Sequence, residues 1–104
     1  MAYVYSLRIA EQTAATAGVT PLFTVPSAKI LIVRDICALC ESAGANVAGI
    51  LRTGGPFVAF WSSAAANTFF DRQGRMVFNA GDVLNLDVGS GTWQVSLSGY
   101  LLDD

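Results

Sequence analysis

The sequence predicts an all-β protein, a two-sheet antiparallel β-sandwich of jelly-roll type with about eight strands. Three observations predict this fold. Short apolar or alternating runs are separated by Gly, Pro, Asn and Asp turn signals at the spacing typical of sandwiches and barrels. The stretch from Leu22 to Cys40 is dense in Ile and Val, which pack well on a pleated surface. No stretch of ten or more residues keeps the 3.6-residue period of an amphipathic helix.

Composition predicts one domain that associates with other chains. The 104 residues show no composition break, so we expect a single domain over 1–104, with an N-terminal strand and loop over 1–21 and the sandwich core over 22–102. Hydrophobic residues make up 53% of the chain and charged residues 13%, about half the share of roughly 25% that is usual in soluble domains. A surface so poor in charge favours partial coverage by neighbouring chains.

The charge pattern argues against nucleic-acid and membrane partners. The net charge is −2 and the six basic residues are scattered, so no basic face is predicted for nucleic acid. No apolar run reaches the ~18 residues that a membrane-spanning helix needs, because Arg34 and Asp35 interrupt the longest candidate. The N-terminus shows no signal-peptide pattern, so we expect synthesis and retention in a cytosol.

The N-terminal part predicts two strands with a loop between them. Residues Tyr3 to Ala10 alternate in the manner of a half-buried strand. Glu11 to Thr20 contains small residues with little apolar bulk, and we expect it to loop across the end of a sheet. Leu22 to Val25 predicts a short strand that Pro26 stops, and the turn after it leads into the long strand.

The long strand after Lys29 is apolar on both faces. Strict alternation predicts two sets, with Ile30, Ile32, Ile36 and Ala38 on one face and Leu31, Val33, Cys37 and Leu39 on the other. This pattern favours the middle of a sheet, and we expect another protein chain to cover part of Ile30 to Cys40. Arg34 and Asp35 point to opposite sides unless a bulge re-aims one of them. Either the strand passes there from core to edge, or Arg34 meets an acid of another subunit.

The C-terminal half predicts six further strands, over Val47–Leu51, Phe57–Trp61, Thr68–Phe70, Met76–Phe78, Val83–Val88 and Trp93–Leu101. Asp71 to Arg75 is predicted to form a polar hairpin loop, and Gly89 to Gly91 a tight hairpin. In the last two strands the apolar side chains alternate cleanly. Those predicted to share one face are Leu84, Leu86 and Val88 in the first, and Trp93, Val95, Leu97, Gly99 and Leu101 in the second.

The chain offers little chemistry for a cofactor or for catalysis. Cys37 and Cys40 form a C-x-x-C pattern, but on a strand they lie about 10 Å apart on opposite faces, too far for a disulfide. A zinc site would need further ligands, and the chain has no His and no other Cys. We therefore predict two buried structural thiols and no cofactor. Without His, and with Asp82 and Asp87 expected on opposite faces, we predict that the protein is not an enzyme.

Aromatic residues are concentrated between Phe57 and Phe70. They fit three interpretations: core packing with incidental exposure, a protein interface, or a platform on which sugars stack. Arginines lie near them in sequence, and both residue types are enriched at interface centres. The candidate protein-interface residues are Arg34, Arg52, Phe57, Phe60, Trp61, Phe69, Phe70, Arg72 and Arg75.

Four short motifs between Leu22 and Leu102 carry a family resemblance. They are Val25-Pro26-x-x-Lys29, Val33-Arg34-Asp35-Ile36, Ala80-Gly81-Asp82-Val83-Leu84, and Val95-Ser96-Leu97-Ser98-Gly99-Tyr100. Together they resemble the small jelly-roll virion proteins of tailed bacteriophages, which include head decoration proteins and tail-associated subunits. This chain has Ser27-Ala28 where such proteins commonly place a Gly before the Lys.

The resemblance implies a structural subunit of a virus particle. It implies a homo-oligomer, with a trimer favoured, that binds the major capsid protein on the outer surface of the head and stabilises the shell after assembly in the host cytoplasm. The alternative it leaves open is a tail- or fibre-associated module that binds a receptor or carbohydrate through the aromatics between Phe57 and Phe70. A glycan is therefore the second partner that we consider.

Overall fold

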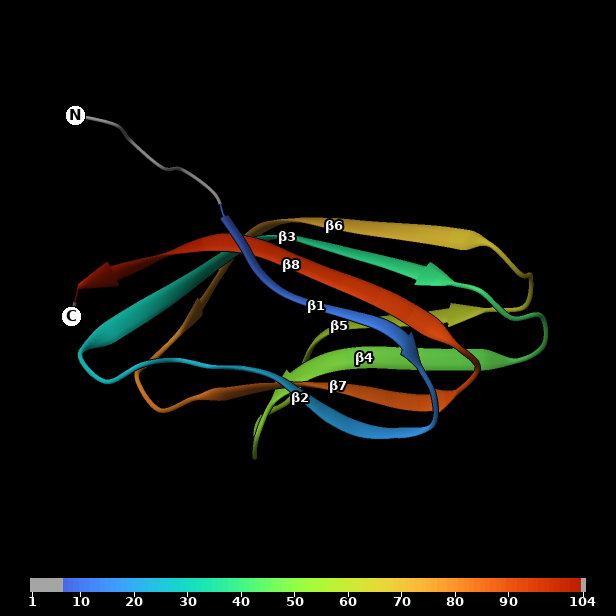
Figure 1. Cartoon of the computed structure of the whole chain (residues 1–104), viewed down its shortest axis with the longest axis horizontal. Helices are drawn as coiled ribbons and strands as arrows, with labels where there is room; N and C mark the ends of the chain where they lie inside the picture. Colours follow the sequence, from blue (N-terminus) through green and yellow to red (C-terminus); the bar gives the residue numbers. More distant parts are fainter. Residues whose placement is uncertain (1–6, 104) are drawn as a thin grey trace.

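The computed structural model describes residues 7–103, which form eight β-strands and the turns between them (Figure 1). The strands are β1 (Leu7–Ala15), β2 (Gly18–Thr24), β3 (Lys29–Cys40), β4 (Asn46–Arg52), β5 (Phe57–Ser63), β6 (Thr68–Phe78), β7 (Val83–Ser90) and β8 (Trp93–Asp103). The prediction of an all-β fold is confirmed. Residues 3–6 of the predicted first strand lie outside the described residues. Within 7–103, no helix is long and apolar enough to cross a membrane.

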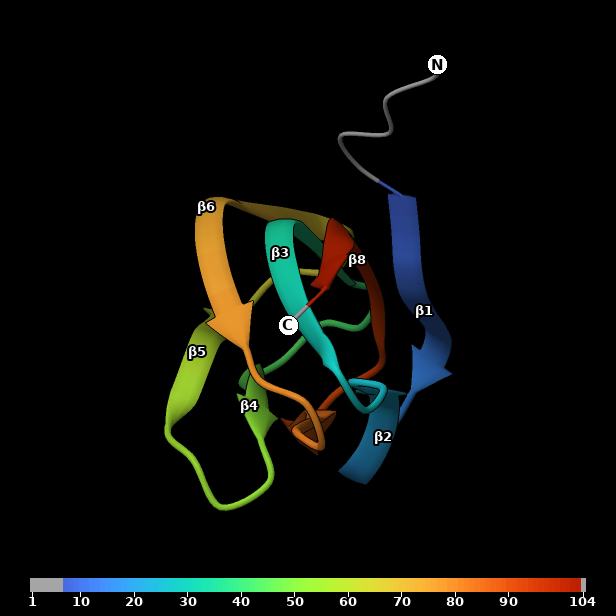
Figure 2. The ribbon, with the colours of Figure 1, turned by 90° about the vertical axis from the view of Figure 1, so that its left-hand side faces the viewer.

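The strands form two four-stranded sheets whose order defines a jelly roll. Sheet A has the order β1-β8-β3-β6 and sheet B the order β2-β7-β4-β5, with every neighbouring pair antiparallel. Figure 2 shows the two sheets as layers, with β6, β3, β8 and β1 in one and β5, β4 and β2 in the other. The chain passes from one sheet to the other after every strand except β4, and this interleaving is the double Greek key of the jelly roll. The predicted sandwich is confirmed.

The core between the sheets is built around Trp93 at the start of β8. Its side chain is fully buried, and its indole Nε1–H donates a hydrogen bond to the Ser90 carbonyl oxygen over 3.0 Å. Trp61 stacks on it with ring centroids 6.2 Å apart, and Phe70 packs against it at 6.0 Å. Because each such aromatic contact is worth about 0.5 to 1.5 kcal/mol beyond area burial, this trio fixes how the two sheets face each other at this end.

A β-bulge at Arg34 decides which side chains of β3 enter the core. The register of β3 shifts between Val33 and Asp35 against both of its neighbours, β6 and β8. The side chains that face the core are Leu31 and Val33 before the bulge and Ile36, Ala38 and Cys40 after it. The two faces predicted by strict alternation are therefore wrong, because the bulge reverses the alternation at Arg34.

Two segments predicted as loops are strands. Residues from Glu11 to Thr20 belong mostly to β1 and β2, with a short turn between them. Asp71 to Arg75 lies inside β6 instead of forming a hairpin. Their small or charged side chains misled the prediction, because β1, β2 and β6 are edge strands held by a backbone ladder on one side, and edge strands tolerate charge.

Two other details of the prediction also need correction. Gly89 to Gly91 does not form a hairpin, because β7 lies in sheet B and β8 in sheet A, so the turn joins the two sheets. Leu101, predicted inward at the end of β8, is 42% exposed. The alternation in β7 and in β8 up to Gly99 is as predicted, with Leu84, Leu86, Val88, Trp93, Val95 and Leu97 in the core.

The four motifs of the family resemblance meet in pairs. Val25 donates its backbone N–H to the Asp82 carbonyl over 2.9 Å and accepts from Gly81 N–H over 3.0 Å, which joins the first motif to the third. Gly99 of the fourth motif pairs with Val33 of the second. A Cβ at Gly99 would fall well inside van der Waals contact with the Ile32 carbonyl oxygen, so β8 can approach the bulged strand only with glycine here.

We predict that Gly99→Ala destabilises the protein by about 3 kcal/mol, because backbone atoms of β3 would have to move to admit one methyl group. Chemical denaturation followed by tryptophan fluorescence measures this. Ser98→Ala on the same strand is the matched control, and we expect it to change stability by less than about 0.5 kcal/mol. Equal midpoints for the two variants would show that the close approach at Gly99 is not required.

Candidate functional site

The predicted aromatic cluster is divided among three places. Trp61 and Phe70 pack in or against the core beside Trp93, so Trp61 is not available to a partner. Phe57 and Phe60 lie on the outer face of sheet B, and Phe69 lies on the outer face of sheet A. No single platform contains all five rings. Each outer face therefore has to be considered separately as a binding surface.

Phe57 and Phe60 form an exposed pair on the outer face of sheet B. Their ring centroids lie 5.3 Å apart in an edge-to-face arrangement, and their exposed fractions are 46% and 57%. Strict alternation along β5 would put Phe57 on the face of Trp61, but the register shifts between Ile50 and Leu51 and brings Phe57 to the face of Phe60. Packing between the rings holds them in place before any partner binds.

A glycine lies directly beneath this pair and leaves space for the rings. Gly49 of β4 is paired with Phe60, and a Cβ added to it would lie 2.5 Å from the Phe57 ring. Leu51 and Asn85 extend the same face, since Leu51 pairs with both Phe57 and Asn85. We call these five residues, Gly49, Leu51, Phe57, Phe60 and Asn85, the sheet B patch.

Asn85 is the polar member of the sheet B patch and has its hydrogen bonds made internally. It is 7% exposed, and its Nδ2 donates to Thr53 Oγ1 over 2.8 Å and to the Val83 carbonyl over 3.2 Å. These bonds also anchor the turn that follows β4. The Asn85 amide N–H groups keep these acceptors when a partner covers the patch. Covering the patch therefore does not carry the cost of burying an amide donor without an acceptor.

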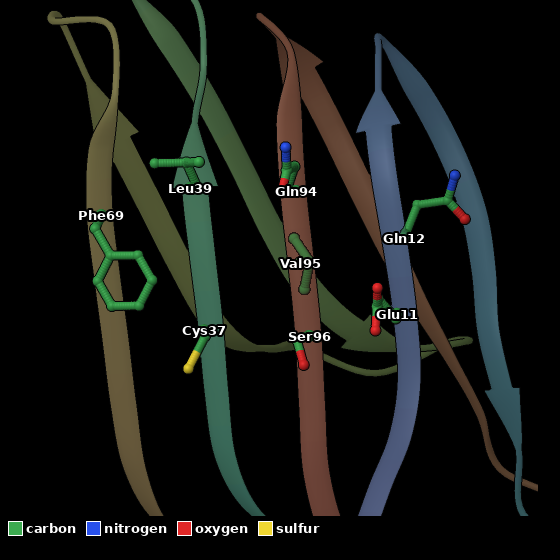
Figure 3. Close-up of a pocket in the computed structure, with 8 residues that line it drawn as sticks. All are labelled: Glu11, Gln12, Cys37, Leu39, Phe69, Gln94, Val95 and Ser96. Atoms are coloured by element: carbon green, nitrogen blue, oxygen red, sulfur yellow. The ribbon is translucent and has the colours of Figure 1, made fainter.

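The outer face of sheet A contains a shallow pocket of about 190 Å³ (Figure 3). Its lining comes from all four strands of the sheet, namely Phe69 of β6, Cys37 and Leu39 of β3, Gln94, Val95 and Ser96 of β8, and Glu11 and Gln12 of β1. Leu39 is paired with both Phe69 and Gln94, and Ser96 with both Cys37 and Glu11. Sequence reasoning missed this site because its residues converge only through the order of the strands.

A second apolar area lies at the other end of the same face. Ile32 pairs with Val77 on one side and with Tyr100 on the other, and Ile30 pairs with Leu102. Val77 and Leu102 are exposed, whereas Ile32 beneath them is 5% exposed. We call Ile32, Val77 and Leu102 the sheet A apolar end. This part of β3 is already half covered by its own sheet neighbours.

The two cysteines have different environments. Cys40 is buried in the core, where its thiol donates to the Ser42 carbonyl over 3.3 Å. Cys37 is half-buried on the outer face, so the prediction that both thiols are buried is wrong for this residue, because the bulge turns it outward. Both are free thiols, as predicted from their opposite faces.

The Cys37 thiol is held in its protonated form. Its pKa is raised first by burial and then by the negative charge of Asp71, whose Oδ1 accepts a hydrogen bond from Sγ over 3.7 Å. Asp35 raises the pKa of this thiol further. A thiol with a raised pKa is a poor nucleophile, so Cys37 does not have the properties of a catalytic cysteine.

The arginines among the predicted interface residues are exposed. Arg34 lies at the bulge of β3, and Arg72 and Arg75 lie on the adjacent edge strand β6. Arg52 ends β4, where its side chain packs over Gly55. Arg72 and Arg75 therefore lie at an edge of the sandwich, Arg52 lies at the end of a strand, and Arg34 lies at the bulge of the inner strand β3.

Acidic residues do not assemble into a metal or catalytic centre in the part of the chain that the structure describes. No group of three or more His, Cys, Asp or Glu side chains that could hold a metal ion occurs in residues 7–103. Asp82 accepts a hydrogen bond from the Asn79 backbone N–H over 2.8 Å, a local bond that is common for Asp in turns.

Comparisons with known proteins add two structural similarities. No protein-family model matches the chain, and no curated protein sequence matches it. The GH26-CBM35 β-(1,4)-mannanase of Podospora anserina aligns with 95% of this chain and 26% of its own, at 15% identity and a TM-score of 0.48. The structure of the infectious bursal disease virus Gx strain aligns with 93% of this chain and 30% of its own, at 15% identity and a TM-score of 0.42.

This chain thus spans less than a third of the length of either structure. Both TM-scores lie below 0.5, and the assignment of the jelly-roll fold rests on the strand order of the two sheets.

We predict that Asp71→Asn makes Cys37 react faster with iodoacetamide between pH 8 and 9. The substitution removes a negative charge and the carboxylate that accepts the thiol hydrogen bond, so the pKa of Cys37 falls and more thiolate is present. Mass spectrometry of the alkylated protein measures the rate.

Asp87→Asn, on the other sheet, is the matched control for this measurement, and Cys37→Ser shows any labelling that comes from Cys40. A rate that is the same in Asp71→Asn and in the unmodified protein would contradict the influence assigned to Asp71.

Proposed function

We propose that this protein is a structural subunit of a virus particle that docks on its partner through the sheet B patch. The observation that carries the proposal is the exposed Phe57 and Phe60 pair, held in a fixed arrangement over Gly49. Large aromatic side chains are among the residues that dominate binding energy at protein interfaces.

The energetics of the patch favour docking. Burying one large apolar side chain is worth about 1.5 to 3 kcal/mol, so two half-exposed rings supply a useful part of the energy of association. The rings are ordered by their mutual contact, and the Asn85 amide already has its acceptors. Little side-chain entropy and little polar desolvation then oppose binding.

The finer proposal is a decoration protein of a tailed-bacteriophage head that contacts the major capsid protein on the outer surface. Its support is the resemblance of the four motifs, which meet in pairs between neighbouring strands of the same sheet. A subunit that binds only the expanded shell stabilises that shell by mass action, because binding one state shifts the equilibrium toward it.

We assign self-association, with a trimer favoured, to the sheet A apolar end. Val77 and Leu102 are exposed there beside β3, the strand that we predict to be covered by another chain. The patch and the apolar end lie on opposite outer faces, so a subunit can bind its copies and the shell at once. The low share of charged residues, 13%, agrees with two covered faces.

We predict that Phe60→Ser weakens binding to undecorated heads of the parent phage by roughly tenfold or more while the oligomer stays intact. Co-sedimentation with the heads gives the affinity, and light scattering after size-exclusion chromatography gives the oligomeric state. Val77→Ser, with equal exposure on the opposite face, is the matched variant, for which we expect a smaller oligomer in solution.

Three outcomes would contradict the proposal. The docking face would be wrong if Phe60→Ser and the unmodified protein bound heads equally well. Self-association through sheet A would be wrong if the unmodified protein were monomeric at all concentrations. A head whose heat resistance did not change on addition of the protein would rule out a decoration role.

A further inference from the structure

The pocket on the outer face of sheet A has a mainly apolar surface, and its polar side chains lie together on one side. We call these two sides the apolar half and the polar half. Phe69 and Leu39 form the apolar half on β6 and β3, and Phe69 is 62% exposed. Gln94, Ser96 and Glu11 form the polar half on β8 and β1. Figure 3 shows the Phe69 ring and the Leu39 side chain on one side of the pocket, with Gln94, Ser96 and Glu11 on the other.

The polar half offers both donors and acceptors in one plane. Ser96 contributes a hydroxyl group, Gln94 an amide and Glu11 a carboxylate. The Gln94 Nε2–H donates to the Glu41 carboxylate just outside the pocket, and this bond orients the amide so that its oxygen is fixed. A rigid strand backbone carries all three groups, so the pocket is formed before a ligand binds.

The dimensions restrict the occupant. At about 190 Å³ the pocket is smaller than the roughly 300 Å³ at the lower end for drug-sized ligands, so it suits a single small ring. Its lining contains no Lys or Arg, and carboxylates of Glu11, Glu41 and Asp71 lie in or beside it. This charge disfavours an anionic ligand such as a uronic acid or a phosphate.

We propose that this pocket binds one pyranose ring of a neutral glycan. A pyranose has one face of C–H groups and a rim of hydroxyl groups, which matches the division of the pocket into two halves. The C–H face would lie on Phe69 and Leu39, where weakly positive hydrogens meet the negative face of the aromatic ring. The hydroxyl rim would exchange hydrogen bonds with Ser96, Gln94 and Glu11.

This site is separate from the proposed docking surface. Of the aromatic residues between Phe57 and Phe70, Phe69 lines this pocket. The pocket lies on the opposite outer face from Phe57 and Phe60. A bound glycan on sheet A therefore leaves the sheet B patch free for another protein. Success or failure of either proposal is independent of the other.

Titration of the full chain with neutral monosaccharides, followed by amide NMR spectra, tests the proposal. The probes are methyl glucoside, methyl galactoside, methyl mannoside and N-acetylglucosamine, with glucuronate as the anionic comparison. We expect at least one neutral sugar to bind with a dissociation constant on the order of 1 to 10 mM and to shift the amides of residues 37–39, 69 and 94–96.

The decisive variants are Phe69→Ala and Phe60→Ala, which remove rings of similar exposure from opposite faces. We expect Phe69→Ala to weaken sugar binding at least tenfold and Phe60→Ala to leave it unchanged, while both keep the amide spectrum of a folded protein. Ser96→Ala should weaken binding less than Phe69→Ala does, by about threefold.

The proposal is overturned if no neutral sugar shifts these amides at 50 mM, or if the shifts persist in Phe69→Ala. It is also overturned if glucuronate binds as tightly as the neutral sugars, because the carboxylates around the pocket would then have no influence on selection.

Discussion

The bulge at Arg34 is the constraint on which the sandwich depends. β3 pairs with both β6 and β8, and both ladders shift by one residue between Val33 and Asp35. In the ladder with β8 the extra residue lies on β3, whereas in the ladder with β6 it lies on β6. Without the shift, Ile36, Ala38 and Cys40 would turn outward and charged Asp35 would turn inward. Because burial of one large apolar side chain is worth about 1.5 to 3 kcal/mol, a flat β3 would lose a large part of the core on this side.

The bulge also explains two neighbouring features. Arg34 is the extra residue in the ladder with β8, so a large charged side chain can leave the sheet there without disturbing the core. Gly99 stands opposite Val33, where β8 has to follow the bent strand closely, and a side chain would collide with the Ile32 carbonyl. Two motifs that look unrelated in the sequence are therefore parts of one local arrangement.

The fold class could be predicted from the sequence because jelly rolls have short strands with clear turn signals and simple alternation. β7 and most of β8 alternate without a break, and their core residues followed directly. Bulges, in contrast, change the face of every residue after them but leave no mark in a periodic pattern. The faces of Cys37 and Phe57 were misjudged for this reason. The edge strand β6 was predicted as two short strands because the charged residues between them resemble those of a loop.

The candidate sites were harder to predict than the fold because they depend on which strands become neighbours. Phe60 and Trp61 are adjacent on one strand, as are Phe69 and Phe70, so each pair must send one ring inward and one outward. The outward rings then separate, because β5 and β6 belong to different sheets. The pocket around Phe69 needs β1, β8, β3 and β6 side by side. None of its three neighbouring pairs, β1 with β8, β8 with β3 and β3 with β6, is consecutive in the sequence.

The edges of the sandwich bear on how such a protein associates. An unprotected edge strand can pair with another chain without limit, which leads to fibres. Here β6 carries Asp71, Arg72 and Arg75, and β2 contains Pro21, which has no N–H to donate. The ladders of β1 and β5 contain register shifts, which twist an edge away from a flat partner. Because the edges are protected in this way, the association that we propose uses the exposed apolar residues of the two outer faces. Contacts between faces can close into a symmetric oligomer, whereas pairing along edges does not, and the proposed subunit of a shell requires closed contacts of this kind.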